Sequence, residues 1–267
     1  MNFLQAIILG IIQGVAEPIP VSSSAQTIIA SFLMKIETPG ILFEVFLNFA
    51  SFLAILWLTR NRVYKIIKGA FLYIGTKNNR FVEDFKMALY VIIGTIPAVI
   101  FGFTMKDIID AYLDRVSIIG VFLIITGCLL FLVRKLRGRK DETSMTWKDA
   151  LIIGLVQGTL SLIPGISRSG STIVAALLIG LKRETAFYYS FLLYLPIGLG
   201  TMILGYKDLI ASPLFTQNIP EYMVMFVVTF FATIVGFNIF KSVMERGKLI
   251  YFSIYCWIVG SILLIMF

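Results

Sequence analysis

The sequence predicts an all-α polytopic membrane protein, and its composition and hydropathy carry that prediction. Of the 267 residues, 58% are hydrophobic and only 14% are charged, whereas soluble domains average about 45–50% apolar and about 25% charged residues. The mean hydropathy is +0.92, and the apolar residues gather in stretches close to the ~20 residues that a helix needs to cross a bilayer. These values exclude a water-soluble globular enzyme, a disordered chain and a disulfide-stapled secreted module.

Six apolar segments are long enough to span a membrane as single helices. They cover residues 41–58, 87–104, 117–133, 186–204, 222–240 and 250–267. Two further apolar regions, 3–34 and 150–181, are interrupted by Pro, Gly and Ser at EPIPVSSS (17–24) and IPGISRSGST (163–172). Each half has only about a dozen residues and is too short to cross. Both regions are therefore predicted to form re-entrant hairpins, whose irregular backbone is satisfied by protein or by a wet cavity.

The two broken regions resemble each other at a single offset of 144 residues. Residues 9–14 (LGIIQG) match 153–158 (IGLVQG), and residues 19–23 (IPVSS) match 163–167 (IPGIS) without a gap. Apolar runs often match by chance, but Gln-Gly and Ile-Pro held in one register do not. The pattern therefore indicates an internal repeat.

This similarity divides a single membrane domain into a first repeat, 1–140, and a second repeat, 141–267. Each repeat has one hairpin and three spans, and an odd number of crossings turns the second copy upside down, which gives inverted repeats. Lys and Arg number seven, six, two and three in loops 59–86, 134–149, 182–185 and 241–249, but one, two and one in 1–40, 105–116 and 205–221. The positive-inside rule then puts the rich loops in the cytoplasm and both termini outside. The hairpins would enter from opposite faces and meet near the middle.

Three charged residues remain inside the apolar regions: Glu17, Glu44 and Arg168. A charge at the bilayer centre costs at least ~2.5–3.5 kcal/mol on insertion scales, which favours a functional role. Glu17 is followed by three serines, and Arg168 lies among Ser and Thr residues, whereas a simple ion pair needs no hydroxyl cluster. A buried Glu–Arg pair that pins the hairpins together remains the alternative. Glu44 either lines the same cavity or extends toward the outer end of its helix.

The hairpin tips also point to an anionic ligand. Short helices starting near Ser24 and Ser169 would bring their unpaired N–H groups and positive dipole ends to one place. Arg168 adds a planar bidentate donor suited to phosphate or carboxylate, and Glu17 is suited to act as a general base or a magnesium ligand. Because the chain has no histidine, His-based triads are excluded. The net charge of +8 is explained by the cytoplasmic loops rather than by nucleic-acid binding.

Two motifs carry a family resemblance. The stretch 13–26 (QGVAEPIPVSSSAQ) contains a Gln-x-x-x-Glu and a Pro-Val-Ser-Ser pattern, and 164–172 (PGISRSGST) contains Pro-Gly-x-Ser-Arg-Ser-Gly-x-Thr. Both resemble motifs of the undecaprenyl-diphosphate phosphatase family of the bacitracin-resistance type. Similarity at 43–45, 96–99 and 191–193 extends the resemblance over nearly the whole chain. It implies hydrolysis of a polyprenyl diphosphate to the monophosphate and inorganic phosphate, with Mg²⁺ or another divalent cation, to recycle the lipid carrier of cell-envelope glycan synthesis.

By position, the resemblance implies Glu17, Ser23 and Arg168 as catalytic residues, with Glu17 also the metal ligand and Ser23 either the nucleophile or a substrate ligand. The residues that it implies for substrate binding are Gln13, Ser22, Gln26, Ser167, Ser169 and Thr172. One departure concerns Gln26, since many members of the family have a histidine there and glutamine cannot transfer protons. Either that histidine is dispensable, or the activity of this chain is weakened or altered.

The expected location is the cell membrane, as a multi-pass protein. The expected partners are a polyprenyl diphosphate lipid and the bilayer, with no nucleic acid, and a homodimer is left open. Two other functions stay open as well. Broken helices in inverted repeats are also typical of transporters, so a lipid-carrier flippase or transporter without hydrolysis is the first alternative. The second is a catalytically inactive lipid-binding relative, because of Gln26.

Overall fold

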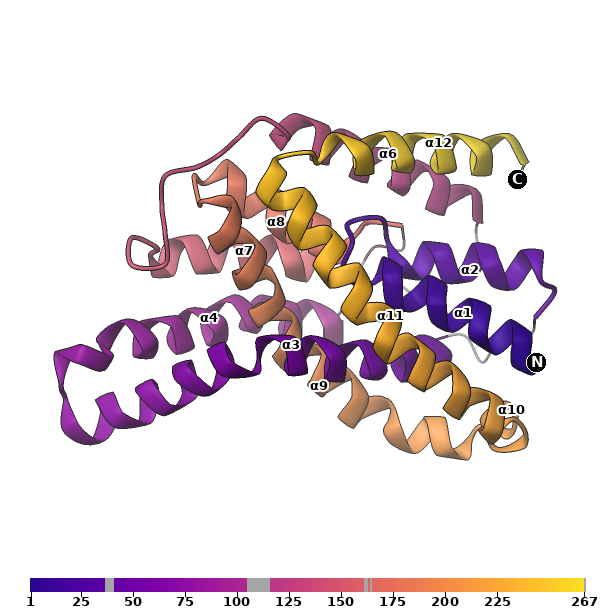
Figure 1. Cartoon of the computed structure of the whole chain (residues 1–267), viewed down its shortest axis with the longest axis horizontal. Coiled ribbons are helices and arrows are strands. Elements are labelled where there is room, and N and C mark those ends of the chain that lie inside the picture. The colour runs from indigo at the N-terminus through magenta and orange to yellow at the C-terminus, as the bar shows by residue number, and fades with distance from the viewer. Residues whose placement is uncertain (37–40, 105–115, 161–162, 164, 267) are drawn as a thin grey trace.

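The computed structural model describes residues 1–36, 41–104, 116–160, 163 and 165–266, which form helices joined by loops (Figure 1). The first part of the chain contains α1 (Phe3–Ala16), α2 (Ser23–Leu33), α3 (Ile41–Thr76), the short 3-10 helix η1 (Asn79–Phe81), α4 (Val82–Thr104) and α6 (Val116–Val133). The second part contains α7 (Trp147–Leu160), α8 (Arg168–Leu178), α9 (Arg183–Ala211), α10 (Pro213–Gln217), α11 (Ile219–Arg246) and α12 (Ile250–Met266). These described segments contain no strand, so the predicted all-α class is confirmed.

Each interrupted region consists of two short helices, as the sequence predicts. α1 and α7 have 14 residues each, and α2 and α8 have 11. At a rise of 1.5 Å per residue, the longer of these helices measures about 21 Å, against a hydrocarbon core of about 30 Å. The first break follows from Pro18 and Pro20, which cannot donate to a helical hydrogen-bond ladder. In the second, Gly165 has a φ of +93°, which favours glycine; Pro164 lies outside the described residues.

Each of the six predicted spans coincides with a helix: α3, α4, α6, α9, α11 and α12. Four helical segments of the described chain are long and apolar enough to cross a membrane, namely Phe43–Thr76, Asn79–Thr104, Arg183–Ala211 and Ile219–Arg246. The other two, in α6 and α12, are shorter apolar helices. The largest departure is α3, which was expected to end at 58 and continues to Thr76. The prediction followed the apolar run, whereas backbone hydrogen bonding continues through the polar segment 59–76, which has no proline to stop it.

Glycines bring α1 and α7 close to long helices from the other part of the chain. α1 packs against α11, and α7 packs against α4. A Cβ added to Gly14 would lie 2.5 Å from the Thr229 carbonyl oxygen, and one added to Gly158 would lie 2.8 Å from the Pro97 carbonyl oxygen. Small residues allow this approach of helix backbones, which is how many membrane helices associate. The first half-helix of each hairpin is thereby fixed against a spanning helix.

The loop 134–149 holds the open end of the second hairpin. The Lys140 backbone N–H donates to the Gly180 carbonyl over 2.9 Å, and the Lys182 N–H donates to the Lys140 carbonyl over 2.7 Å. The Lys182 ammonium also donates to Asp141 over 3.1 Å. Hydrogen bonds from Thr143 and then Lys182 hold the pKa of Asp141 well below its usual range. These contacts join the end of α8 to the loop that precedes α7.

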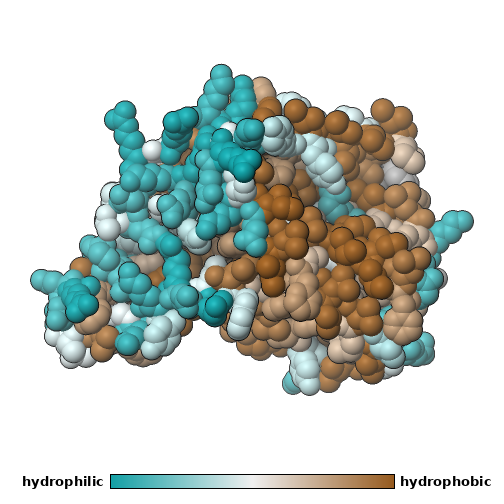
Figure 2. Space-filling model, viewed as in Figure 1, coloured by the Kyte–Doolittle hydropathy of each residue, from teal (hydrophilic) through white to brown (hydrophobic). Residues whose placement is uncertain are grey.

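Charged and apolar side chains occupy different parts of the surface. Figure 2 shows the hydrophilic side chains gathered over the α3–α4 turn and the loop 134–149, with an apolar surface toward the other end. The start of α1 and the end of α12 lie at that other end (Figure 1). Large apolar side chains such as Phe231 and Ile258 are more than half exposed. An apolar surface of this extent suits contact with lipid, in agreement with a multi-pass membrane protein.

Candidate active site

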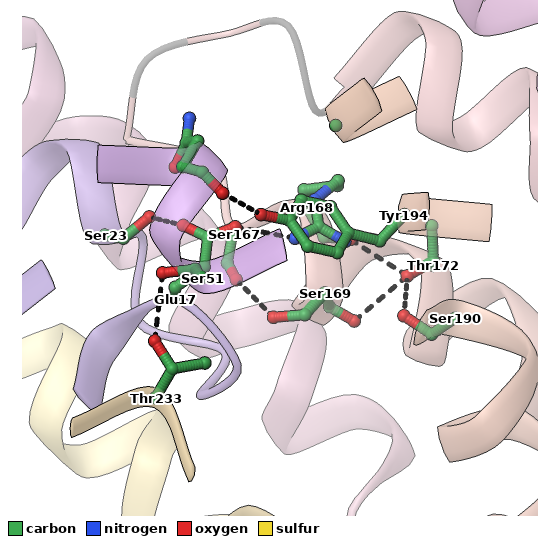
Figure 3. Close-up of polar contacts among 12 residues, drawn as sticks. Glu17, Ser23, Ser51, Ser167, Arg168, Ser169, Thr172, Ser190, Tyr194 and Thr233 are labelled. Carbon is green, nitrogen blue, oxygen red and sulfur yellow. Dashed lines mark hydrogen bonds and ion pairs between the residues drawn. The ribbon is translucent and has the colours of Figure 1, made fainter. Parts of the chain in front are cut away.

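The tips of the two hairpins meet at Glu17, the buried residue that ends α1. Ser23, the first residue of α2, donates its hydroxyl hydrogen bond to Glu17 Oε2. Arg168, the first residue of α8, donates from Nη2 to Glu17 Oε1 over 2.7 Å. Figure 3 shows these side chains converging between the hairpins. The three predicted catalytic residues are therefore in direct contact, although they belong to three different helices.

The two short helices that follow the tips share one feature of their first turn. The backbone carbonyls of Ser22 and Ser167 each accept the N–H of the residue four positions on, over 3.1 and 2.8 Å, and these serines are the N-caps. The N-caps are one residue further apart than the 144-residue offset of the sequence match, because the second loop is one residue longer. The gapless alignment paired Ser23 with Ser167, whereas by helix position Ser23 corresponds to Arg168. The first residue of each helix thus reaches the same carboxylate.

The N-terminal ends of α2 and α8 add a positive potential at this point. The sequence predicts that these helices begin near Ser24 and Ser169, and each begins one residue earlier. A helix N-terminus presents unpaired N–H groups and the positive end of its dipole. Two such ends beside one guanidinium form an environment that favours an anion.

Arg168 is held by an aromatic ring as well as by its contact with Glu17. Its guanidinium carbon lies 3.9 Å from the centre of the Tyr194 ring, on α9. The Tyr194 hydroxyl in turn donates to the backbone carbonyl of Asn48 over 2.9 Å. Within the described part of the chain, Arg168 Nη1 is buried and has no hydrogen-bond partner. A buried donor without a partner is costly, so the site retains one guanidinium nitrogen ready for a ligand oxygen.

Gln13 connects Glu17 to α3. Its Nε2 donates to Glu17 Oε2 over 3.1 Å and to Asn48 Oδ1 over 2.8 Å. Glu17 lies four residues after Gln13, so the two side chains share one face of α1. The carboxylate therefore receives hydrogen bonds from Gln13, Ser23 and Arg168. These contacts fix the orientation of Glu17 and compensate for its burial.

The remaining hydroxyl groups surround the first turn of α8. Ser167 Oγ accepts the N–H of the residue three positions on over 3.2 Å and lies 3.2 Å from Ser169 Oγ. Thr172 Oγ1 donates to the Arg168 carbonyl over 2.9 Å and lies 2.6 Å from Ser190 Oγ on α9. Ser167, Ser169 and Thr172 are all buried. Their hydrogen bonds fix the start of α8 and with it the position of Arg168.

Two predicted substrate-binding residues have other contacts. Gln26 Nε2 donates to the Val21 carbonyl over 2.9 Å, and Gln26 Oε1 accepts from the Tyr255 hydroxyl of α12 over 2.7 Å. Ser22 Oγ lies 3.4 Å from Ser24 Oγ. The structure thus brings Gln26 to α12 rather than to Glu17. Gln26, at the position for which the family resemblance implies histidine in many members, thus bridges two helices.

Three contacting residues were not predicted: Asn48, Tyr194 and Ser190. All three side chains are neutral and lie in the spanning helices outside the two motifs, so neither charge nor motif marks them. A signal did exist for Asn48, because it lies four residues after Glu44 and such residues share a helix face. Glu44 itself is partly buried in the first turn of α3, and its role stays a prediction.

The acidic side chains at the site suit a magnesium ion that binds together with substrate, and not one held by protein ligands alone. The described residues contain no group of three His, Cys, Asp or Glu side chains that could hold a metal ion. Magnesium, however, usually binds through one or two carboxylates together with substrate phosphates and water. Glu17, with the neighbouring Ser23 hydroxyl, therefore fits an ion that arrives with a diphosphate, and does not fit a preformed protein cage.

Comparison with known proteins matches the chain along nearly its whole length. Undecaprenyl-diphosphatase 2 of Bacillus thuringiensis (strain Al Hakam) is 44% identical over 262 residues, covering 98% of this chain and 97% of the relative. Undecaprenyl-diphosphatase 1 of Halalkalibacterium halodurans is 42% identical over 261 residues, covering 98% and 95%. The undecaprenyl-diphosphatase of Oceanobacillus iheyensis is 39% identical over 260 residues, covering 97% and 94%. A family model described as "Bacitracin resistance protein BacA" matches residues 6–262, and the chain belongs to this family.

Proposed function

We propose that the chain hydrolyses undecaprenyl diphosphate to undecaprenyl phosphate and inorganic phosphate, which recycles the lipid carrier of cell-envelope glycan synthesis. The observation that carries this proposal is one contact network containing a carboxylate, a hydroxyl and an available guanidinium nitrogen, from Glu17, Ser23 and Arg168. The relatives at 42–44% identity are named undecaprenyl-diphosphatases, which supports the substrate. The proposed reaction uses each of these three groups.

The geometry supports Glu17 as the general base for Ser23. The Ser23 hydroxyl already donates to Glu17, so its proton passes to the carboxylate as Oγ attacks the terminal phosphorus. The bond from that phosphorus to the bridging oxygen breaks, and the monophosphate leaves with the proton from Glu17. Water then attacks the phosphoserine, phosphate departs and Ser23 recovers a proton. If water is the nucleophile instead, Glu17 activates it and Ser23 holds the phosphate.

Arg168 and the helix ends stabilise the charge that develops on the phosphoryl oxygens. Phosphoryl transfer depends mainly on positioning and on neutralisation of these oxygens. The Tyr194 ring holds the Arg168 guanidinium from one face, so Nη1 is oriented before substrate arrives. Ser167, Ser169 and Thr172 hold the first turn of α8, and one preorganised donor is worth about 10²–10³ in turnover.

Magnesium would bind with the substrate. Glu17 would hold it together with the diphosphate oxygens, and the ion would supply neutralisation of their charge. Chelation should therefore abolish phosphate release without unfolding the protein. Thermal melting measured with and without EDTA checks that the protein stays folded when the metal is removed.

We also propose the inverted arrangement of the two repeats, with both termini outside the cell membrane. The segregation of Lys and Arg among the loops supports it. So does the packing of α1 on α11 and of α7 on α4, since corresponding elements would make corresponding contacts. A homodimer is the assembly to test, by light scattering of the detergent-solubilised protein.

The decisive experiment is phosphate release by purified protein in detergent, with undecaprenyl or a shorter polyprenyl diphosphate, in the presence and absence of magnesium. Turnover without any gradient supports the enzyme, and its absence favours a flippase or an inactive lipid-binding relative. The double variant Glu17→Gln with Arg168→Gln is the control, because it removes both charges together. Release at a near wild-type rate by that variant would contradict the site. Acid quenching followed by mass spectrometry decides whether phosphoserine forms at Ser23.

A further inference from the structure

A lateral groove lies beside the first hairpin. Its volume is about 620 Å³, and it is lined by side chains of α1, α2, the loop between them and α12. Ile, Val, Leu and Ala side chains form most of its wall, and α12 contributes Tyr251, Phe252 and Tyr255. Leu33, at one edge, is 65% exposed. The groove is therefore open to the lipid at its side and has the volume of a ligand site, typically about 300–1,000 Å³.

This groove adjoins the loop that joins two residues of the candidate active site. Ile19 and Val21 line it, and both belong to the loop that connects Glu17 to Ser23. On one side of this loop the polar groups of Glu17 and Ser23 are in contact. The same short loop presents its apolar side chains to the groove. A molecule with a diphosphate at the site and a hydrocarbon chain could therefore follow the loop from one environment to the other.

A polar bridge marks the place where the groove meets the loop. Gln26 joins the Val21 carbonyl, over 2.9 Å, to the Tyr255 hydroxyl, over 2.7 Å. The bridge satisfies a loop carbonyl that would otherwise face an apolar groove, where an unpaired polar group is costly. It also fixes the distance between α2 and α12. The groove is thus held open at a defined width next to the loop that carries Ser23.

The occupant must gain something that bulk lipid does not offer. Transfer of a hydrocarbon chain from lipid into the groove brings no hydrophobic gain, because lipid tails are as apolar as the wall. What the groove can offer is shape, through a wall of branched side chains, and a fixed direction relative to Ser23. Both favour the chain attached to the reacting diphosphate over an unattached acyl chain, because tethering makes its entry intramolecular.

We infer that this groove binds the first isoprene units of the polyprenyl diphosphate and so aligns its terminal phosphorus with Ser23. The inference rests on the proposed function for the identity of the substrate. It assigns Gln26 and Tyr255 a positioning role, since they act through the loop and the groove and do not contact Glu17. Alignment of this kind affects turnover, because misplacement of a reacting group by about 1 Å can cost about 10²-fold.

The first test measures binding without hydrolysis. The probe is a non-hydrolysable farnesyl methylenediphosphonate with a photoreactive diazirine in its first isoprene unit. Labelling confined to peptides of α1, α2 and α12, and displaced by unlabelled farnesyl methylenediphosphonate, supports the groove. Labelling spread equally onto α4, or not displaced by the competitor, overturns it. Because no phosphate is released, this result is independent of whether the chain is a phosphatase.

The second test fills the groove. Ile29→Trp should reduce turnover of farnesyl diphosphate by about tenfold, while turnover of methyl diphosphate, which has no isoprene unit to place in the groove, should change less than twofold. Leu33→Trp, at the exposed edge, serves if Ile29→Trp does not fold. The matched control is Val99→Trp in the separate apolar hollow on α4, which should leave both substrates unchanged. Equal losses on the long and short substrates would overturn the inference.

Discussion

In α8 the nine residues from Ser169 to Leu177 are buried, whereas in α2, a helix of the same length, the buried residues are Ala25, Thr27, Ala30 and Ser31. α8 packs against α6, α7 and α9. α2 instead lines a groove that is open to lipid. Two hairpins with similar sequences thus lie in different environments, one enclosed by helices and the other at the edge of the protein.

The serines at the two tips are used differently as well. Ser167 Oγ accepts the Gly170 N–H and caps α8, while the Ser22 side chain makes no such cap. Ser23 therefore carries the hydroxyl that contacts Glu17, and Arg168 occupies the same helix position in the other hairpin. In the proposed mechanism the second hairpin would hold the anion through Arg168, and the first would carry Glu17 and Ser23 and meet the lipid chain.

The largest expected effect concerns the orientation of the hairpins. In a variant with Cys128 and Cys256 replaced by serine, single cysteines at Gly75 and Thr143 should react with a membrane-impermeant thiol reagent only from the cytoplasm. A cysteine at Ala211 should react only from outside. Labelling of intact cells and of inverted vesicles makes the comparison. Reaction of positions 75 and 211 from the same side would break the inverted relation between the hairpins.

The second effect separates chemistry from capping. Ser23→Ala should reduce phosphate release by roughly 10³-fold, within the range for loss of an acid–base or nucleophilic partner, with little change in melting. Ser167→Ala should lose about 1 kcal/mol of stability, as expected for loss of an N-cap, and should retain more turnover. The two rates and two melting curves are measured side by side. If the two variants lose turnover equally, the proposed division between the hairpins is wrong.

The third effect tests whether Arg168 acts through the bidentate geometry of its guanidinium group. Arg168→Lys keeps the charge but loses bidentate geometry and the second nitrogen, so turnover should fall by roughly 10²-fold while melting changes little. Removing the charge of Arg168 altogether leaves Glu17 as a buried charge without its cation, which costs about 3–5 kcal/mol of stability. Arg168→Gln should show that cost, and adding Glu17→Gln should restore folding without activity. Recovery of both would favour the ion-pair alternative.

The fourth effect compares a glycine at which α7 packs closely on α4 with a glycine that has open space around it. Gly158→Ala forces a Cβ to 2.8 Å from backbone atoms of Pro97, whereas the same change at Gly102 meets nothing within 4 Å. Overpacking of this kind costs about 1–3 kcal/mol. Gly158→Ala should therefore lower the melting temperature, and Gly102→Ala should leave it unchanged or raise it slightly. Identical melting of the two variants would remove close backbone packing as the anchor of α7.

The smallest effect concerns Asp141 and its contact with Lys182 at the open end of the second hairpin. Because the pKa of Asp141 is held below its usual range, its contribution to stability is present above the unfolded-state pKa and is lost as pH falls through the folded-state pKa. Asp141→Asn should lower the melting temperature slightly at pH 7, and the difference should shrink on acidification. The group is exposed, so the effect is small. A difference that grows toward low pH would contradict this account.

Local sequence was sufficient for most of the fold and for the centre of the site. Proline and glycine mark where the hairpins break, and apolar runs mark the spanning helices. The convergence of Glu17, Ser23 and Arg168 follows because isolated charges and hydroxyls in membrane segments need partners. Asn48 and Tyr194 could not be predicted in the same way, since their contacts depend on how α3 and α9 pack around the tips. The sequence match also did not predict that the helix N-caps Ser22 and Ser167 are one residue out of its register. The second loop has one residue more, and this insertion leaves the motif itself unchanged.

The ion pair at the tips has a consequence for selectivity. With Glu17 and Arg168 in contact over 2.7 Å, the two opposite charges cancel, so the ligand-free protein does not present an uncompensated cation to the membrane. An ordinary anionic phospholipid, which carries a single phosphodiester charge, gains little by competing for that pair. A diphosphate brings a doubly charged terminal group and more oxygens, enough to engage the second guanidinium nitrogen as well. We therefore expect the ion pair to disfavour binding of the ordinary lipids of the bilayer relative to a diphosphate.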